Sequence, residues 1–111
     1  MSNWTVKFYS TSRLDKPVED FIENQDKATY AKIVRLLGTL SEYGPDLGMP
    51  YSRYMKNGLY ELRVRGKNEI RIFYLFQIKK TIYLLHAFKK SSQKTPRREL
   101  KIAINRQKEL T

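Results

Sequence analysis

Residues 59–88 constrain the fold more than any other stretch, because they alternate like three consecutive β-strands. Residues 66–68, Gly-Lys-Asn, are the expected turn between the first two strands, and this turn places Arg63 directly opposite Arg71. Like charges that face each other destabilise a sheet. The arginine pair therefore indicates that this face binds a polyanion.

The two faces of these strands differ in chemistry. One face is apolar and is expected to lie under helices, whereas the other is cationic near the turn and aromatic farther along. The last strand is apolar on both faces. Its two alternating sets are Ile82, Leu84, His86 and Phe88 on one side and Tyr83, Leu85 and Ala87 on the other.

The residues before this region indicate one strand and two helices. A weak alternation predicts a strand over residues 4–10. Asp15 is the expected N-cap of the first helix, with Pro17 in its first turn. A second helix with a broad apolar stripe should begin after Asp26 and end at Tyr43. The short connection between the two helices predicts a helical hairpin.

The remaining segments complete the expected fold. Residues 44–58 hold three glycines and two prolines, which predicts a loop with at most short extended pieces. Thr95 and Pro96 predict the N-cap and first turn of a last helix over about residues 96–110, with Arg106 on its outer side. We therefore expect a single α+β, sandwich-like domain over residues 1–111 in the order β-α-α-β-β-β-α, with a mostly antiparallel sheet.

The charge of the chain is distributed unevenly. The formal net charge is +11. Residues 1–50 carry six Lys or Arg and seven Asp or Glu, whereas residues 51–111 carry sixteen and four. This asymmetry indicates one basic functional face and a negatively charged partner.

Composition also narrows the possible chemistry and location. Cysteine is absent and histidine occurs once, so neither a disulfide, a metal site nor a cofactor is expected. No stretch has the pattern of a signal peptide or the length of an apolar transmembrane helix. We therefore expect a cytoplasmic protein without a membrane partner.

Phosphate recognition is the chemistry that the residues support best. Arg63 and Arg71 are the first candidates, because a guanidinium group donates hydrogen bonds in a planar fork. Lys89, Lys90 and Lys94 follow the last strand and are expected to close the same site from one edge.

Three further residues are candidates for contact with RNA. Arg53 and Tyr54 belong to a segment that alternates cations with aromatic rings, which suits phosphate contact and base stacking. Tyr54 equally fits a ring packed on the sheet edge with its hydroxyl in water. Arg65 continues the cationic face beyond Arg63, and a solvated basic surface is the alternative for it.

Two residues are candidates for proton transfer. His86 is the single histidine, although its apolar strand face also fits a packed, hydrogen-bonded ring. Glu61 is either a base or a group that relieves the repulsion between the arginines. Because the sequence offers no paired carboxylates, Ser-His-Asp set or Gly-rich phosphate loop, the enzymatic route that remains is metal-free RNA cleavage by the ribose 2′-hydroxyl.

Three motifs in order resemble the RelE/ParE toxin superfamily, and most closely its phage-derived, HigB-like branch. They are Leu-Tyr-Glu-Leu-Arg at 59–63, Arg-Ile-Phe-Tyr at 71–74, and His-Ala-Phe-Lys-Lys-Ser-Ser-Gln-Lys-Thr-Pro at 86–96. The resemblance implies a microbial ribonuclease-like RelE fold and a type II toxin that cleaves mRNA on the translating ribosome. It also implies a cognate antitoxin, commonly a helix-turn-helix protein, that joins the toxin in a hetero-oligomer.

The same resemblance assigns roles by position. Arg63 and Arg71 match the strand-borne cations that bind phosphate, and Lys89 or Lys90 matches a basic catalytic side chain after the last strand. Glu61 departs from the pattern, since the RelE type has a basic residue there. Two alternatives stay open: a ParE-like toxin that targets gyrase, and a non-enzymatic, basic nucleic-acid-binding module.

Overall fold

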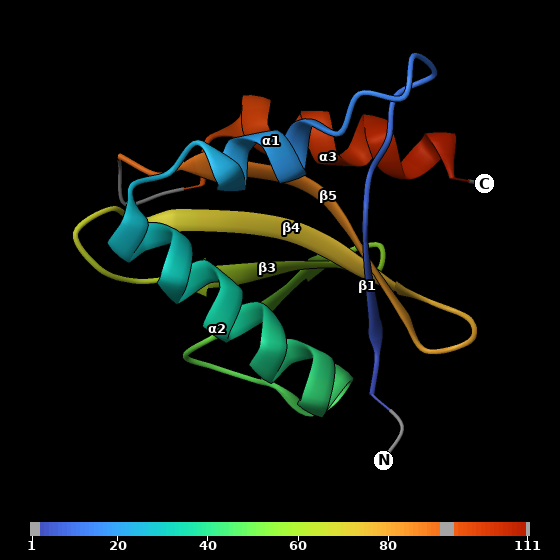
Figure 1. The fold of residues 1–111 in the computed structure, drawn as a ribbon. Coiled ribbons are helices and arrows are strands. Elements are labelled where there is room, and N and C mark those ends of the chain that lie inside the picture. The colour runs from blue at the N-terminus through green and yellow to red at the C-terminus, as the bar shows by residue number, and fades with distance from the viewer. Residues whose placement is uncertain (1–2, 92–94, 111) are drawn as a thin grey trace.

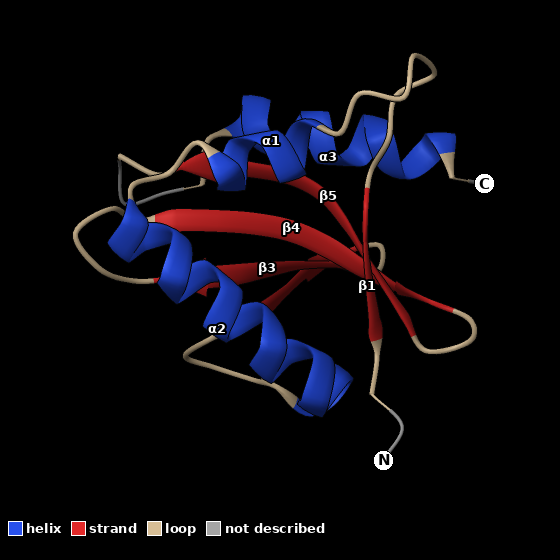
Figure 2. Cartoon of the chain, in the orientation of Figure 1, coloured by secondary structure: helices blue, strands red, loops and turns tan. Residues whose placement is uncertain are grey.

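The structure, a computed structural model, describes residues 3–91 and 95–110. In these residues, one five-stranded sheet has the strand order β1-β5-β4-β3-β2, in which β1 is parallel to β5 and the other neighbours are antiparallel (Figures 1 and 2). The strands are β1 (Thr5–Phe8), β2 (Ser52–Lys56), β3 (Leu59–Val64), β4 (Ile70–Gln77) and β5 (Thr81–Lys89). The helices are α1 (Pro17–Glu23), α2 (Lys27–Tyr43) and α3 (Arg97–Glu109), with a short 3-10 turn at Gly44–Asp46.

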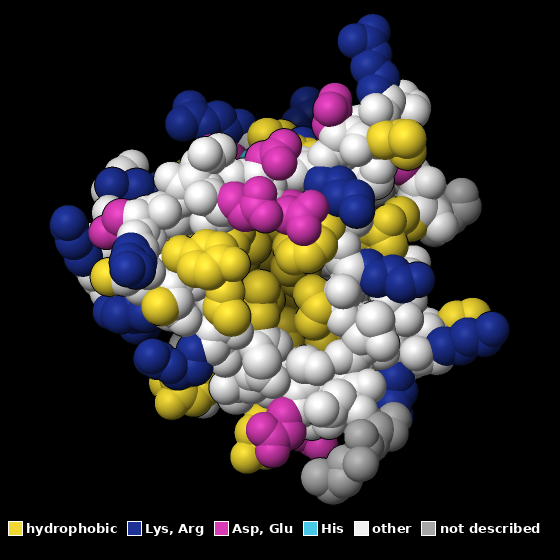
Figure 3. All heavy atoms as spheres, viewed as in Figure 1, with side chains coloured by type: hydrophobic (Ala, Val, Ile, Leu, Met, Phe, Trp, Pro, Cys, Tyr) yellow, Lys and Arg dark blue, Asp and Glu magenta, His cyan; other side chains and the backbone are white. Residues whose placement is uncertain are grey.

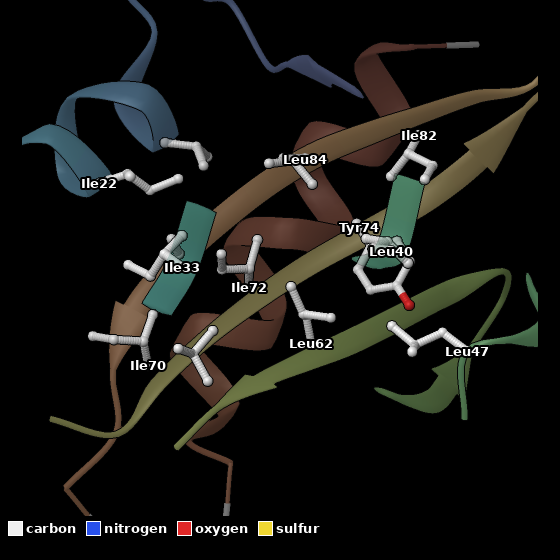
Figure 4. Close-up of a cluster of buried hydrophobic side chains, with 13 residues drawn as sticks. Ile22, Ile33, Leu40, Leu47, Leu62, Ile70, Ile72, Tyr74, Ile82 and Leu84 are labelled. Atoms are coloured by element: carbon white, nitrogen blue, oxygen red, sulfur yellow. The ribbon is translucent and has the colours of Figure 1, made fainter. Parts of the chain in front are cut away.

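The helices cover both faces of the sheet, so the fold is a mixed α+β arrangement in three layers. One apolar core lies between the sheet and the pair α1 and α2, and its buried side chains include Ile33, Leu62 and Leu84 (Figure 4). A second core lies between the sheet and α3, around Phe73 and Ala103. In the described part of the chain, no helix has the length and apolar character needed to cross a membrane.

The helix signals in the sequence are partly confirmed. Asp26 caps α2 by accepting a hydrogen bond from the Thr29 N–H at 3.1 Å. Asp15 is not the cap of α1, because Lys16 occupies that position and makes no side-chain capping bond. Helices α1 and α2 contact each other but diverge from their connection, and an apolar patch lies between them (Figures 1 and 3).

The strands β3, β4 and β5 confirm the predicted meander, but β2 is missing from the prediction. The observed order is β-α-α-β-β-β-β-α. Strand β2 pairs with β3 across a tight turn at Asn57 and Gly58, whose φ angles of 52° and 84° are both positive. Asn-Gly is the preferred pair for such a hairpin turn, so the sequence did carry a signal for this strand.

A β-bulge in β5 changes the side to which its second half points. Phe73 pairs with His86 and Tyr74 pairs with Leu84, which leaves Leu85 as the extra residue. The predicted grouping of His86 and Phe88 with Leu84 is therefore wrong. Phe88 packs in the core beneath α3, and His86 contacts α3 as well.

Candidate functional site

The predicted arginine pair lies on the α3 side of the sheet. Arg63 and Arg71 are direct partners in the β3–β4 ladder. Between them lies Glu61, which has no exposed surface. Its Oε1 is 3.4 Å from Arg63 Nε and 3.7 Å from Arg71 Nε. The carboxylate therefore offsets the repulsion that the sequence predicts for the two guanidinium groups.

Arg71 is almost completely buried and is held mainly by carboxylates. Its Nη1 donates to Glu69 Oε1 at 3.2 Å, whereas its buried Nε has no hydrogen-bond partner among the described residues. Burial raises the pKa of Glu69, but the hydrogen bonds from Arg71 and the Gly66 N–H outweigh this effect and lower the pKa overall. A buried guanidinium N–H without a hydrogen bond is unfavourable, so Arg71 depends on the nearby carboxylates of Glu61 and Glu69 for compensation of its charge.

Only one of the two lysines after β5 reaches this arginine pair. The backbone N–H of Lys90 donates a hydrogen bond to the backbone carbonyl of Glu69 at 2.7 Å. Burial, followed by the positive charge of Arg71, lowers the pKa of the Lys90 ammonium group. Lys90 therefore lies within electrostatic reach of the arginines.

Lys89 lies on the opposite face. It pairs with Ile70, whose side chain belongs to the core beneath α1 and α2. There it acts on Asp26, whose pKa is lowered chiefly by hydrogen bonds from Thr29 and to a smaller extent by Lys67 and Lys89. The structure thus separates two neighbouring lysines that the sequence treated as equivalent.

Thr95 joins the group in a way that the sequence did not reveal. Its Oγ1 donates to Glu61 Oε2 at 2.8 Å. The expectation that Thr95 caps the last helix is wrong, since α3 has Pro96 at its N-cap position and no side-chain capping bond. The hydroxyl instead attaches the chain before α3 to the buried carboxylate. Lys94, the other predicted residue of this segment, lies outside the described residues.

The predicted RNA-binding residues divide between the two faces. Arg53 is the ladder partner of Glu61 and is exposed on the edge strand, beside the arginine pair. Arg65 is exposed and lies 3.9 Å from Glu69. Tyr54 is the partner of Tyr60 and packs against that ring on the α2 side, so it does not belong to this group.

We call the resulting cluster the arginine site. Its members come from β3, the β3–β4 turn, β4, the residue after β5 and the segment before α3, and they are Glu61, Arg63, Glu69, Arg71, Lys90 and Thr95. Exposure of the side chain rises from 4% at Arg71 to 14% at Arg63 and 58% at Arg65. The site therefore reaches the surface along β3.

His86 belongs to a separate cluster beneath α3. Its Nε2 lies 2.6 Å from Glu99 Oε1, and its Nδ1 lies 3.5 Å from Arg106 Nη1. Because Arg106 can only donate, Nδ1 accepts a hydrogen bond from Arg106, and Nε2 carries the ring proton and donates a hydrogen bond to Glu99. Burial lowers the pKa of His86, although Glu99 acts in the opposite direction. Both ring nitrogens are thus occupied in a neutral imidazole.

Arg106 is the centre of this second cluster. The prediction that it faces outward is therefore wrong. It also donates to the Leu85 carbonyl at 2.8 Å, and its guanidinium lies 4.7 Å above the Tyr9 ring. The Tyr9 hydroxyl donates to Glu109 at 2.7 Å. We call this group of Tyr9, His86, Glu99, Arg106 and Glu109 the α3 cluster. It fastens α3 to the sheet.

The chemistry that the arginine site can support is the binding of an anion with dispersed negative charge. Three cationic side chains share it with two carboxylates, so it carries a net positive charge. Within residues 3–91 and 95–110, no three His, Asp or Glu side chains converge in a way that could hold a metal ion.

Comparison with known proteins identifies the family. No curated protein matches the sequence. The family model for phage derived protein Gp49-like matches residues 20–108, so the chain belongs to this family. The family is associated with the toxins of toxin-antitoxin systems. The matched residues include all those of the arginine site.

Proposed function

We propose that this protein is the toxin of a type II toxin-antitoxin pair, a cytoplasmic endoribonuclease that cleaves mRNA on the translating ribosome. The observation that carries the proposal is the position of Arg63, Arg71 and Lys90 around the buried Glu61. The Gp49-like family supports the toxin class. A RelE-type fold and the HigB-like branch are the finer parts of this proposal.

The proposed reaction is attack by a ribose 2′-oxygen on the adjacent phosphorus. The 2′-hydroxyl gives its proton to solvent water and its oxygen forms a new bond to phosphorus, while the bond to the 5′-oxygen breaks and that oxygen takes a proton from Lys90. The products are a 2′,3′-cyclic phosphate and a free 5′-hydroxyl. Negative charge on the phosphoryl oxygens increases in the transition state, and fixed cations in a site of low dielectric constant stabilise it. Arg63 contacts the phosphate from the surface, while the buried Arg71 adds charge beneath it.

The geometry favours Lys90 over the two residues that the sequence suggested for proton transfer. Glu61 already accepts the Thr95 hydroxyl and faces both arginines, so its role is to hold them. His86 has both nitrogens occupied in the α3 cluster. The lowered pKa of Lys90 makes it the better proton donor to the departing 5′-oxygen.

The proposed partners are mRNA, the ribosome and a cognate antitoxin, which we expect to be a helix-turn-helix protein. Induced expression tests the target directly. Growth and protein synthesis should stop, and primer extension should reveal new 5′ ends within coding regions. If replication stops while translation continues, the protein acts on gyrase. If neither stops and RNA binding is retained, it is a binding module.

A purified-protein assay tests the chemistry. The wild type should cleave mRNA bound to purified translating ribosomes and leave a 2′,3′-cyclic phosphate, the product of attack by the 2′-oxygen. Arg71→Ala should abolish this cleavage while Lys7→Ala, at the far edge of the sheet, should leave it unchanged. Full activity in Arg71→Ala would show that the arginine site is not the active site.

A further inference from the structure

An open groove of about 430 Å³ lies between α2 and the outer edge of β3. Its polar lining is cationic on both walls, and among the described residues that line it none is acidic. The residues that matter here are Lys32, Arg35 and Thr39 on α2, and Tyr51, Arg63 and Arg65 on the opposite side.

The groove exists because β2 is shorter than β3. The ladder between these strands begins at Ser52 and Leu62, and the Arg63 N–H makes one more hydrogen bond, to the Tyr51 carbonyl at 2.8 Å. Beyond that point α2 faces the end of β3. Lys32 Nζ lies over Gly66 in the following turn, so closely that a Cβ there would collide with it.

Two observations connect the groove to the arginine site. Arg63 lines the groove and is also a member of the site, and Arg65 lines the groove at the point where the site reaches the surface. Lys32 and Arg35 are neighbours on one side of α2 because they are three residues apart. Lys and Arg side chains gather along this edge, on the left of Figure 3.

We propose that this groove binds the RNA strand where it leaves the arginine site, with phosphates on Lys32, Arg35 and Arg65. Tyr51 is 49% exposed and stacks on an unpaired base. A single strand is the ligand that combines accessible base faces with a row of phosphates. The inference rests on the proposed function, since it extends the same RNA site across the edge of the sheet.

Binding of 2′-O-methyl RNA tests the groove without cleavage, because the methyl group blocks the attacking oxygen. We expect Lys32→Ala/Arg35→Ala to bind a twelve-nucleotide strand roughly tenfold more weakly at 0.1 M salt. The slope of log affinity against log salt should fall by about 0.7 for each lost phosphate contact. Lys7→Ala/Arg13→Ala removes one exposed Lys and one exposed Arg at the opposite edge and should change neither quantity.

Strand length and Tyr51 sharpen the test. A dinucleotide fills the arginine site alone, so the Lys32/Arg35 variant should bind it like the wild type. Tyr51→Ala should weaken binding of the long strand about tenfold, whereas Tyr51→Phe keeps the stacking ring and should restore it. Equal affinity of wild type and the Lys32/Arg35 variant for the long strand would overturn the proposal. Circular dichroism checks that each variant is folded. If Lys32→Ala/Arg35→Ala is not folded, Lys32→Gln/Arg35→Gln replaces it in the binding test.

Failure of the groove and failure of the proposed function give different results. If the wild type cleaves mRNA and the Lys32/Arg35 variant has unchanged KM and kcat, the protein is a ribonuclease but the groove does not bind its RNA. Raised KM with unchanged kcat supports both. If no variant cleaves RNA but the loss of binding follows the groove residues, the groove stands and the ribonuclease function is wrong.

Discussion

Two ionic clusters lie on the α3 side of the same sheet, and they differ in whether their donors are satisfied. The α3 cluster joins His86, Glu99 and Arg106, and the Arg106 guanidinium donates to a carbonyl and covers the Tyr9 ring. In the arginine site, by contrast, the buried Arg71 Nε has no hydrogen-bond partner among the described residues, and three cations surround Glu61. A closed network of this kind stabilises the packing of α3, whereas a cluster with spare donors and excess positive charge is suited to bind an anion.

Glu61→Ala should have the largest effect on stability. The substitution leaves Arg63 and Arg71 facing each other without the carboxylate between them. Removal of one partner from a buried ion pair costs about 3–5 kcal/mol in the free energy of unfolding. Urea denaturation measures the change. Glu23→Ala, at an exposed position of α1, is the control and should change stability by less than about 0.5 kcal/mol.

Arg71→Lys and Arg106→Lys compare the two clusters with the same substitution. If Arg71 stabilises the transition state, Arg71→Lys should reduce kcat by a factor of about 10²–10³, because an ammonium group cannot contact Glu61 and Glu69 as the guanidinium does and the charge beneath the phosphate shifts. Arg106→Lys should leave kcat unchanged but lower the free energy of unfolding by about 1–2 kcal/mol, since it loses the bond to the Leu85 carbonyl. If Arg106→Lys instead reduced kcat and Arg71→Lys only lowered stability, the α3 cluster would be the active site and the arginine site would be structural.

Thr95→Val should have a smaller effect on the arginine site. It removes the hydroxyl donor from the buried Glu61 Oε2, which costs about 1–3 kcal/mol in the free energy of unfolding. Thr95→Ser retains the donor and should be close to the wild type. Thermal unfolding of the three proteins measures this difference. Destabilisation by Thr95→Ser but not by Thr95→Val would mean that the methyl group of Thr95, rather than its hydrogen bond, contributes the stability.

His86 should give a modest dependence of stability on pH. Its pKa in the folded protein lies below the usual value of about 6.5, so the unfolded chain binds the proton first as the pH falls. The free energy of unfolding should therefore decrease as the pH falls through about 6.5 toward the lower folded pKa. His86→Gln should lack this decrease in urea titrations between pH 7.5 and 5. The pH profile of RNA cleavage should be the same in both proteins, and a difference would return His86 to the list of catalytic residues.

The arginine pair shows how much of the site the sequence could predict. Strand alternation and one three-residue turn were enough to place Arg63 opposite Arg71, because hairpin register follows from the turn. The same alternation failed for His86. A strand that is apolar on both sides gives no sign of an extra residue, so the bulge at Leu85 became visible only through pairing with β4.

The partners of the site depended on contacts between distant segments. Thr95 looks like a helix cap in its local sequence, but its hydroxyl is used by Glu61, 34 residues earlier. Lys89 and Lys90 are neighbouring residues of the same type. Only the fold shows that they lie on opposite faces of the sheet. Lys32 and Arg35 belong to the nearly neutral half of the chain, yet α2 carries them to the basic edge of β3.

The sequence alone was sufficient to predict the meander, the helix that begins after Asp26, the opposed arginines and the basic character of the second half. These features arise from residues close in the chain, whose spacing sets strand register and helix periodicity. The tertiary structure alone decided that Glu61 lies between the arginines with Thr95 attached, that His86 is enclosed beneath α3, and that a cationic groove borders the site. Such features depend on which faces pack together, and burial of the core determines that only once all the elements meet.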